Sequence, residues 1–390
     1  MKIAILTSGI LPVPAVQGGA VENLVDFYLE YNDQHKLHDI TVYSIWHPDV
    51  EQHPDLKSDV NHYKYIKVDS AISKIRKNIY GKLHQNEYYH YTIEYFFEQA
   101  YKQIRRESFD IIIVENRPGF SLKLSKRLTT PCVLHLHNDF LNKDTKNAAE
   151  IYSGYQRIIS VSDFITGRTQ EIDANKNKCI TIHNAIDLQH FRQAKLKQRK
   201  EMGLSEKDFV VGYSGRLREE KGILQLVQAI NQIHNIPNLK LLIIGASNYG
   251  KGQQPSPFVL QLMKEAEPVK DKVIFTGFVD YQDVPAYLKM ADLAVVPSMW
   301  EEPFGLTVIE AMAAGLPLIT TNSGGIPEIC DGVATIVERD HIVENLRDAI
   351  RDLYLHPEKR KSMAEASLQR SKRFDKETYA KNFLKALESL

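Results

Sequence analysis

Short apolar runs alternate along this chain with longer stretches in which apolar residues recur at helical spacing. The short runs are rich in isoleucine and valine, as in buried strands, and the longer stretches are typical of amphipathic helices. In the first half of the chain the predicted strands are residues 2–7, 40–45, 111–114, 133–136, 158–161 and 180–183. In the second half they are residues 210–213, 240–244, 273–275, 293–296, 318–320 and 335–337. Six strands in each half predict an α/β fold with two doubly wound parallel sheets.

A polar, basic stretch at residues 192–200 separates the two sets of strands and is predicted to be the linker region. The expected domains are therefore residues 1–191 and 192–372, followed by a helix within residues 373–390. A chain of 390 residues is too long for one ordinary core and suits two α/β domains. Its 43% hydrophobic and 25% charged residues are typical of soluble globular proteins.

The chain carries 49 basic and 49 acidic side chains, so its formal net charge is zero. Charge therefore gives no indication of nucleic acid as a partner, and we expect none. Cys132, Cys179 and Cys330 lie far apart, each in or beside an apolar segment, which favours buried free thiols in a reducing compartment. The sequence opens on a strand instead of a signal peptide, and it has no apolar run of about 18 residues. We expect a cytoplasmic protein.

Two carboxylates in the second half carry the strongest indication of function. Glu302 and Glu310 are separated by seven residues, and residues 307–314 are predicted to form a helix that Gly315 ends. Pro303 places Glu302 on the preceding loop and Glu310 about one turn inside the helix. Free N–H groups at the helix start can bind phosphate, and the carboxylates can accept hydrogen bonds from vicinal hydroxyls. The arrangement suits a sugar nucleotide.

A glycine-bounded basic loop follows the strand that ends near Tyr213. Gly215 lets the backbone approach a ligand, and Arg216 and Lys221 can neutralise a diphosphate as it leaves the sugar. Such a loop on its own is more often a solvated surface loop. Because the two acids lie downstream, we favour the phosphate-binding interpretation.

The first half has two candidate segments at the ends of predicted strands. Gly18 and Gly19 open a helix after the first strand, without the G-x-G-x-x-G pattern of a dinucleotide site. His137 lies at the end of the fourth strand, whereas His135 lies deeper and is predicted to be a core histidine. A metal site would need further ligands, and only Asp139 offers one nearby, so we expect no metal.

Residues 71–84 contain four basic residues and no acid, and their apolar residues recur at helical spacing. This pattern fits a surface helix whose apolar side belongs to the core. It fits equally a helix lying on an anionic membrane, which would make the protein peripheral on the inner face of the membrane. Both interpretations stay open.

Glu302 and Glu310, with Phe-Gly-Leu between them and AMAAGLPLITT and GGIPE after them, resemble the E-x7-E motif of glycosyltransferase family 4, the group 1 glycosyltransferases. Matching pieces recur at residues 18–19, 137, 184–187 and 215–222 and in the C-terminal tail. The resemblance therefore covers nearly the whole chain.

The resemblance implies a GT-B fold, in which two Rossmann-like domains face a cleft and a C-terminal helix returns to the first domain. It implies a retaining transfer of a sugar from a UDP- or GDP-linked donor to a glycan or lipid-linked acceptor, in the synthesis of cell-surface polysaccharide or glycoconjugates. No cofactor is expected besides this donor substrate. The sequence lacks a D-x-D metal motif, so we expect the transfer to be independent of metal.

The resemblance also implies residue roles. His137, Glu302, Arg216 and Lys221 are the expected catalytic residues; Glu302 would bind sugar hydroxyls and Glu310 the ribose. The expected donor-binding residues are Gly18, Gly19, Gly215, Arg216, Lys221, Phe278, Glu302, Phe304, Gly305, Leu306, Thr307 and Glu310.

Two alternatives share the two-domain fold. One is a sugar-nucleotide epimerase, which the E-x7-E motif disfavours. The other is a non-catalytic sugar-nucleotide-binding or coat protein that retains a transferase fold. Both acids and both cations of the predicted donor site are present, and this disfavours a protein that has lost the site.

Overall fold

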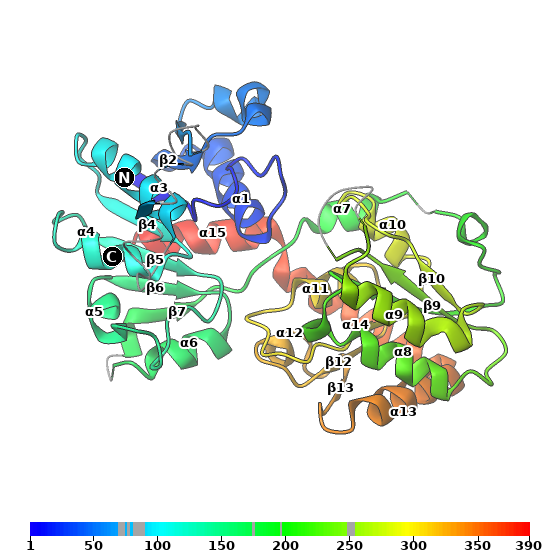
Figure 1. Ribbon diagram of the computed structural model, residues 1–390. Coiled ribbons are helices and arrows are strands. Elements are labelled where there is room, and N and C mark those ends of the chain that lie inside the picture. Colours follow the sequence, from blue (N-terminus) through cyan, green and yellow to red (C-terminus); the bar gives the residue numbers. More distant parts are fainter. Residues whose placement is uncertain (69–74, 76–78, 81–89, 174–175, 196, 248–253) are drawn as a thin grey trace. The chain divides into compact units, whose positions relative to one another are not determined.

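The chain forms two compact units, each built around a parallel sheet (Figure 1). The computed structural model describes residues 1–390 except 69–74, 76–78, 81–89, 174–175, 196 and 248–253. The first unit comprises Met1–Asn184 and Lys376–Leu390, and the second comprises Ala185–Asp375. The predicted domain boundary at residue 191 falls inside helix α7 (Leu188–Gln193), which belongs to the second unit.

The first unit contains a seven-stranded sheet of order β3-β2-β1-β4-β5-β6-β7 in which all neighbours are parallel. Its strands are β1 (Lys2–Leu6), β2 (Asp39–Ile45), β3 (Asn61–Ile66), β4 (Ile111–Glu115), β5 (Cys132–Leu136), β6 (Arg157–Ser160) and β7 (Cys179–Thr181). The strand order reverses between β1 and β4, and loops at such a reversal leave room for a ligand beyond the carboxyl ends of the strands.

Strand β3 is an addition to the six strands predicted for this half. Its sequence, NHYKYI, alternates polar and aromatic residues in place of the apolar run that marks a buried strand. Among the described residues it lies at one edge of the sheet, where it pairs with β2. Lys64 forms an ion pair with Glu107, and the Tyr65 hydroxyl donates to the Val13 carbonyl at 3.2 Å. An edge strand needs only one apolar side, so the rule for buried strands missed it.

Helices surround this first sheet. Those that the structure describes are α1 (Ala20–His35), α3 (Tyr91–Ile104), α4 (Ser121–Leu124), α5 (Ala148–Ser153), α6 (Asp163–Gln170) and α15 (Lys376–Leu387). Helix α15, red in Figure 1, comes from the end of the chain and packs on α1. The rings of Tyr28 and Phe383 stack there with centroids 4.4 Å apart. The last segment of the chain is therefore part of the first unit.

The second unit contains a six-stranded parallel sheet of order β10-β9-β8-β11-β12-β13. Its strands are β8 (Phe209–Ser214), β9 (Leu239–Ile244), β10 (Val273–Phe275), β11 (Leu293–Val296), β12 (Leu318–Thr321) and β13 (Thr335–Val337). Its helices are α7, α8 (Ile223–Gln232), α9 (Pro257–Ala266), α10 (Val284–Leu288), α11 (Leu306–Ala313), α12 (Ile326–Cys330), α13 (Ile342–Leu355) and α14 (Pro357–Ser371). The six predicted strands are confirmed, and the order reverses between β8 and β11.

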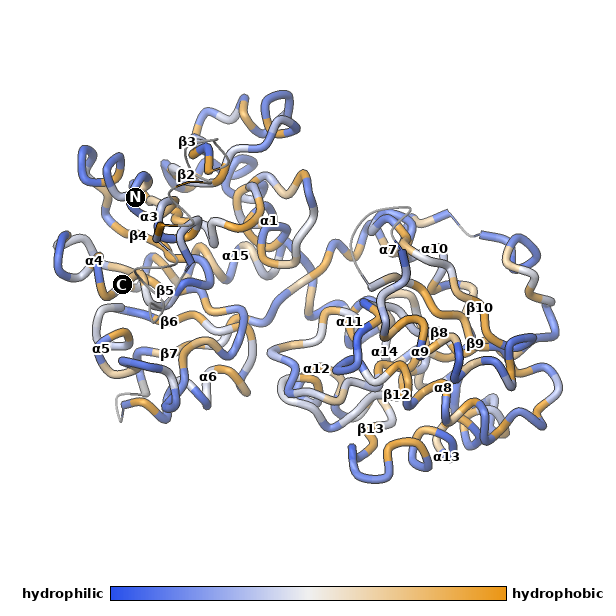
Figure 2. Tube along the Cα trace, in the orientation of Figure 1, coloured by the Kyte–Doolittle hydropathy of each residue, from blue (hydrophilic) through white to orange (hydrophobic). Residues whose placement is uncertain are grey.

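The core of each unit follows the strands, which are the most apolar segments of the chain (Figure 2). In the second unit Val211, Leu241, Ile243, Val295 and Ile319 are fully buried on central strands. Each such side chain contributes about 1.5–3 kcal/mol of hydrophobic stabilisation. The three cysteines are free and buried, as predicted.

Within the described part of the chain, no helix combines the length and the apolar character needed to cross a membrane.

Residues 71–84, the predicted amphipathic segment, lie almost entirely outside the described residues. Ile75 and Ile79 are described and are 65% and 54% exposed. Neither isoleucine therefore belongs to the core of the first unit. Association of this segment with a membrane stays a prediction.

Candidate active site

In the second unit the loops that follow β8 and β11 pack against each other where the strand order reverses. Gly222 has a φ of 69° and begins α8. A Cβ atom at this position would lie 1.8 Å from the carbonyl oxygen of Pro297, so only glycine fits. Nearby, the Met299 amide donates to the Glu220 carbonyl at 2.9 Å. The two predicted motifs, distant in sequence, are joined by backbone contacts.

Glu302 and Lys221 meet at this junction. The Lys221 Nζ donates to Glu302 Oε1 at 2.6 Å, and the Ser298 hydroxyl donates to the same oxygen at 2.8 Å. Glu302 is only 8% exposed, and its carbonyl accepts from the Gly325 amide at 2.8 Å. The Lys221 ammonium also lies 5.0 Å from the ring centre of Trp300. Lys221, one of the predicted cations, thus forms an ion pair with Glu302, one of the two predicted acids.

Arg216 is exposed, and among the residues that the structure describes its guanidinium has no hydrogen bond or ion pair. Its carbonyl accepts a hydrogen bond from the Tyr213 hydroxyl at 3.0 Å. Burial raises the pKa of Tyr213, Glu302 and Glu220 raise it further, and Arg216 opposes the change. The Tyr213 hydroxyl is therefore within electrostatic range of both Glu302 and Arg216. The guanidinium remains available for an anionic ligand.

Glu310 lies inside α11, as predicted, and is 7% exposed. Burial raises the pKa of its carboxyl group from 4.5 to about 7, although a hydrogen bond from the Tyr281 hydroxyl opposes this. The Tyr281 ring lies beside the rings of His190 and Phe191, at 6.0 and 6.5 Å between centroids. Sequence analysis missed Tyr281, because no motif connects residue 281 with the distant acid that it contacts.

The start of α11 is open. Gly305, with a φ of 115°, precedes the helix, and no side chain caps it. Phe304 is buried against Phe374 with ring centroids 6.0 Å apart, so its side chain belongs to the core and only its backbone could contact a donor. Leu306 and Thr307 are half-buried in the first turn. This geometry suits an anion at the first N–H groups of the helix.

Phe278 and Gly215 occupy different parts of the same sheet edge. Phe278 is half-buried just after β10, and β9 separates that strand from β8. Gly215 follows β8 directly with a φ of 152°, and a Cβ atom at Gly245 would lie 2.1 Å from its carbonyl oxygen. Gly215 therefore lies in a close backbone contact with Gly245, and Phe278 follows a strand two positions away in the sheet.

In the first unit the loop after β1 contacts the buried carboxyl group of Glu22. Gly19 begins α1 with a φ of 108°, and a Cβ atom there would lie 2.3 Å from Glu22 Oε2. Gly18 has a φ of 71°. The Ser8 hydroxyl donates to Glu22 Oε1 at 3.1 Å, and burial raises the pKa of Glu22 to about 7. Gly19 thus permits a close approach to Glu22, which the sequence analysis did not single out, whereas a Cβ atom at Gly18 would meet no atom within 4 Å.

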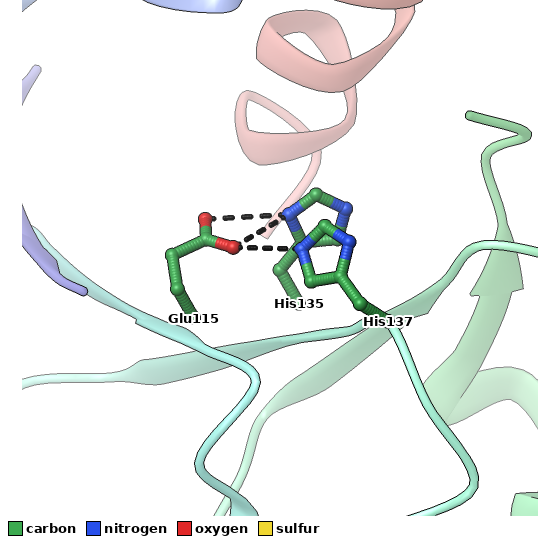
Figure 3. A group of neighbouring side chains, drawn as sticks. All are labelled: Glu115, His135 and His137. Carbon is green, nitrogen blue, oxygen red and sulfur yellow. Dashed lines mark hydrogen bonds and ion pairs between the residues drawn. The ribbon is translucent and has the colours of Figure 1, made fainter. Parts of the chain in front are cut away.

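His137 belongs to a buried cluster at the end of β4 and β5 (Figure 3). Glu115 Oε2 lies 2.9 Å from His135 Nδ1 and 3.0 Å from His137 Nε2. The Tyr28 hydroxyl donates to the other oxygen of Glu115 at 2.8 Å. The two histidine rings lie 4.0 Å apart. His135 is fully buried, which confirms its predicted place in the core.

The charges within this cluster follow from burial and proximity. Burial lowers the pKa of His137 to about 4, and the neighbouring His135 lowers it further, whereas Glu115 opposes the change. Burial would raise the pKa of Glu115, but the two histidines outweigh it and hold that pKa at about 2. At neutral pH the cluster therefore contains an ionised Glu115 and a neutral His137.

The carboxylate beside the histidines is Glu115, in place of the Asp139 considered from the sequence. Asp139 forms an ion pair with Arg168 at 2.6 Å. The ligand atoms of Glu115, His135 and His137 lie within 4.8 Å of one another and are of types that bind transition metals. Each histidine is hydrogen bonded to the carboxyl group, His137 Nε2 to Oε2 at 3.0 Å and His135 Nδ1 to Oε1 at 3.3 Å.

Sequence analysis missed the polar run Glu115-Asn116-Arg117. Asn116 has a φ of 53°, and its side-chain oxygen accepts from the His137 amide at 3.1 Å. Arg117 Nε donates to the Ser8 carbonyl at 2.8 Å. The signal was present in the sequence, since three polar residues directly follow the apolar run Ile111–Val114 at a strand end. Each has a buried partner on another loop.

Two family models match consecutive parts of the chain. The model described as "Glycosyltransferase Family 4" matches residues 34–190, and the model described as "Glycosyl transferases group 1" matches residues 194–370. The second match contains all six strands of the second sheet, and the first contains the strands of the first sheet except β1.

Among curated proteins, the chain is similar to spore coat protein SA of Bacillus subtilis, with 29% identity over 100% of this chain and 99% of that protein. It is also similar to lipopolysaccharide 1,2-N-acetylglucosaminetransferase of Salmonella typhimurium, with 26% identity over 67% of this chain and 69% of the relative. Among solved structures, Anabaena HepE in complex with UDP and glucose is 21% identical, with a TM-score of 0.73 and full coverage of both chains.

Proposed function

Because the chain belongs to the group 1 glycosyltransferases with the GT-B fold, we propose that it transfers a sugar from a nucleotide-sugar donor to a glycan or lipid-linked acceptor. Glycosyltransferase function is common to the family models and to a curated relative. The donor class, the retaining course and the role in cell-surface polysaccharide or glycoconjugate synthesis are the parts that we propose. The solved neighbour that holds UDP and glucose supports a UDP-linked donor as the first choice.

The Lys221–Glu302 pair is the observation that carries this proposal. In the free protein Lys221 and Glu302 form an ion pair. A sugar hydroxyl that donates to Glu302 would take the place of Lys221, and a diphosphate that attracts Lys221 would take the place of Glu302. The two groups are 2.6 Å apart, so their ligands must be neighbours as well. A hexose attached to a diphosphate meets this requirement.

Glu310 and Arg216 extend the same site. An ionised carboxylate can accept hydrogen bonds from both ribose hydroxyls, and the buried position of Glu310 strengthens such bonds. The exposed Arg216 can form a bidentate pair with phosphate. We assign the ribose to Glu310 and the sugar to Glu302, because Glu302 is the acid that contacts the phosphate-binding lysine.

The proposed transfer proceeds with retention and without a metal ion. Arg216, Lys221 and the first N–H groups of α11 would stabilise the charge that develops on the leaving diphosphate. The diphosphate would then assist deprotonation of the acceptor hydroxyl on the same face of the sugar. Two carboxylates placed as acid and nucleophile would instead point to hydrolysis, and here Glu302 is engaged by Lys221 and Ser298.

The decisive test is release of nucleoside diphosphate from nucleotide sugars by the purified protein. UDP- and GDP-linked sugars are first compared by thermal shift, since a bound donor stabilises the protein in proportion to ln(1 + [L]/Kd). The stabilising donors are then incubated with cell-envelope glycans and lipid-linked saccharides. Acceptor-dependent release that is lost in Lys221→Met supports transfer. Stabilisation without release for any acceptor would contradict it.

A coat protein is the second candidate, because a relative that aligns along the full chain is a spore coat protein. In this case the donor site would bind a sugar nucleotide without turnover, and the protein would assemble with surface structures. Donor binding that produces no product, together with retention of the protein in a purified coat fraction, would favour this function.

A further inference from the structure

The carboxylate of Glu115 is buried and already has three hydrogen-bond partners. Tyr28 donates to Oε1, His135 Nδ1 is hydrogen bonded to the same oxygen at 3.3 Å, and His137 Nε2 is hydrogen bonded to Oε2 at 3.0 Å. An ionised carboxylate can only accept hydrogen bonds. The nitrogens that face it, Nδ1 of His135 and Nε2 of His137, must therefore carry protons.

The opposite nitrogen of His137 is then left without a proton or a partner. Its Nδ1 is buried, and within the described ranges of the chain it has no hydrogen-bond partner. A second proton there would make a buried cation, which is unfavourable in this environment. Nδ1 of His137 is thus a buried lone pair at the end of strand β5, where a Rossmann-like sheet binds its ligand.

We propose that Glu115 is a positioning residue that fixes His137 in the tautomer protonated at Nε2, so that Nδ1 accepts a hydrogen bond from a hydroxyl group of the substrate. The identity of this substrate rests on the proposed transferase function, but the tautomer does not. Glu115 touches only protein groups and acts through His137.

The backbone of His137 has a hydrogen bond of its own, in addition to that of the side chain. The His137 amide donates to Asn116 Oδ1 at 3.1 Å, and Asn116 is held in a left-handed conformation with a φ of 53°. Glu115 and Asn116 are adjacent, so one short segment binds both ends of His137. Such support keeps a ligand-binding group in one orientation before the ligand arrives.

A fixed acceptor has consequences for specificity. A sugar hydroxyl opposite Nδ1 would donate a hydrogen bond to the unpaired nitrogen. A sugar carboxylate at the same place could not donate, and it would also be repelled by the negative charge of Glu115. The arrangement therefore favours a neutral sugar over a uronic acid at this position. UDP-glucose and UDP-glucuronic acid are a matched pair of probes for this choice.

A metal ion is the alternative occupant of the same cluster. Two imidazoles and a carboxylate are suitable ligands for zinc, and they lie close enough together. A metal ion between Glu115 and His137 would have to replace the proton on Nε2. The hydrogen-bond distances and the third donor from Tyr28 favour the proton, and the experiment distinguishes the two.

The direct test is the tautomer of His137 in the full chain, measured by long-range proton–nitrogen correlation after selective labelling of histidine with nitrogen-15. His137→Gln identifies the signals. We expect a neutral ring protonated at Nε2 at pH 7.5, and the same state in Tyr28→Phe, which leaves both histidine contacts of Glu115 in place. A ring protonated at Nδ1, an imidazolium, or one tightly bound zinc per chain with a shifted His137 signal would each overturn the proposal.

Kinetics test the consequence. Glu115→Gln can donate as well as accept, so it no longer fixes the tautomer, and we expect kcat/KM to fall by about 10- to 100-fold. His137→Asn keeps a carbonyl acceptor near the position of Nδ1, whereas His137→Gln places its amide near Nε2. Higher activity in the asparagine variant supports the proposal, and equal or higher activity in the glutamine variant contradicts it. If no transfer is found with any donor, the proposed function fails, while the tautomer measurement still decides the role of Glu115.

Discussion

Glu310 should reduce the stability of the free protein, and this cost should depend on pH. Its carboxyl group is 7% exposed on α11, and burial raises its pKa from 4.5 to about 7. Between these two pH values the folded state holds a proton that the unfolded state has released. Stability therefore falls as pH rises through this window, and the full loss is present above pH 7. The two pKa values correspond to a loss of about 3 kcal/mol as an upper limit.

Replacing Glu310 by glutamine removes this titration and keeps an acceptor for the Tyr281 hydroxyl. We expect Glu310→Gln and the parent protein to have similar stability at pH 4.5, and the variant to be more stable at pH 8. For the second unit, residues 185–375, a difference of about 3 kcal/mol raises the unfolding temperature by about 6–12 °C. Unfolding in urea at both pH values measures the free energy directly.

The control is Glu365→Gln, which removes an exposed carboxylate from α14 of the same unit. It should change stability little at either pH, so a general effect of net charge can be separated from burial. If Glu310→Gln unfolds at or below the temperature of the parent at pH 8, the carboxyl group is not desolvated as its position on α11 requires. A gain of equal size at both pH values would point to packing instead of ionisation.

Three further outcomes concern ligands. Glu310→Ala should weaken binding of free UDP in calorimetry, whereas Glu302→Ala should mainly weaken recognition of the sugar; equal loss of UDP affinity in both would contradict this division of roles. Transfer should persist in EDTA, because Lys221 and its neighbours supply the positive charge; complete loss that added Mg²⁺ or Mn²⁺ restores would refute metal independence. The chain has two tryptophans, so Trp46→Phe leaves Trp300 as the only one, and its fluorescence should change when a diphosphate draws the Lys221 ammonium from its place 5.0 Å from the ring. Unchanged fluorescence at saturating UDP would mean that the lysine stays in place.

The strands of the second unit could be predicted because each is a short apolar run, including the edge strands β10 and β13. Runs such as Leu293–Val296 are buried on both faces, so their sequence differs sharply from that of the surrounding helices. The same reasoning missed β3 (Asn61–Ile66), an edge strand with polar and aromatic residues. Its place depends on pairing with β2 and on contacts such as the Lys64–Glu107 ion pair, which are tertiary. Periodicity alone does not record such contacts.

The predicted residues of the donor site share a simple property. Glu302, Glu310 and Lys221 lie in compact sequence motifs, so their roles could be predicted from residues close to them in the sequence. Phe304 lies in the same motif but is buried against Phe374, because a motif does not tell which of its side chains point inward. Tyr281 contacts Glu310 from a different loop and was missed, since that contact exists only in the folded chain.

The first unit shows why topology is the better guide to such missing residues. Strand order reverses between β1 and β4, and the residues that follow these strands, Ser8 and Arg117, are joined by a hydrogen bond of 2.8 Å. The second unit repeats this arrangement at β8 and β11, where Lys221 meets Glu302. A polar residue directly after an apolar strand must satisfy its hydrogen bonds at the sheet edge, and at a reversal the nearest partner is the loop of the neighbouring strand. By this argument Arg117 could have been selected from the sequence once β4 was placed beside β1, because it follows β4 and its partner Ser8 follows β1.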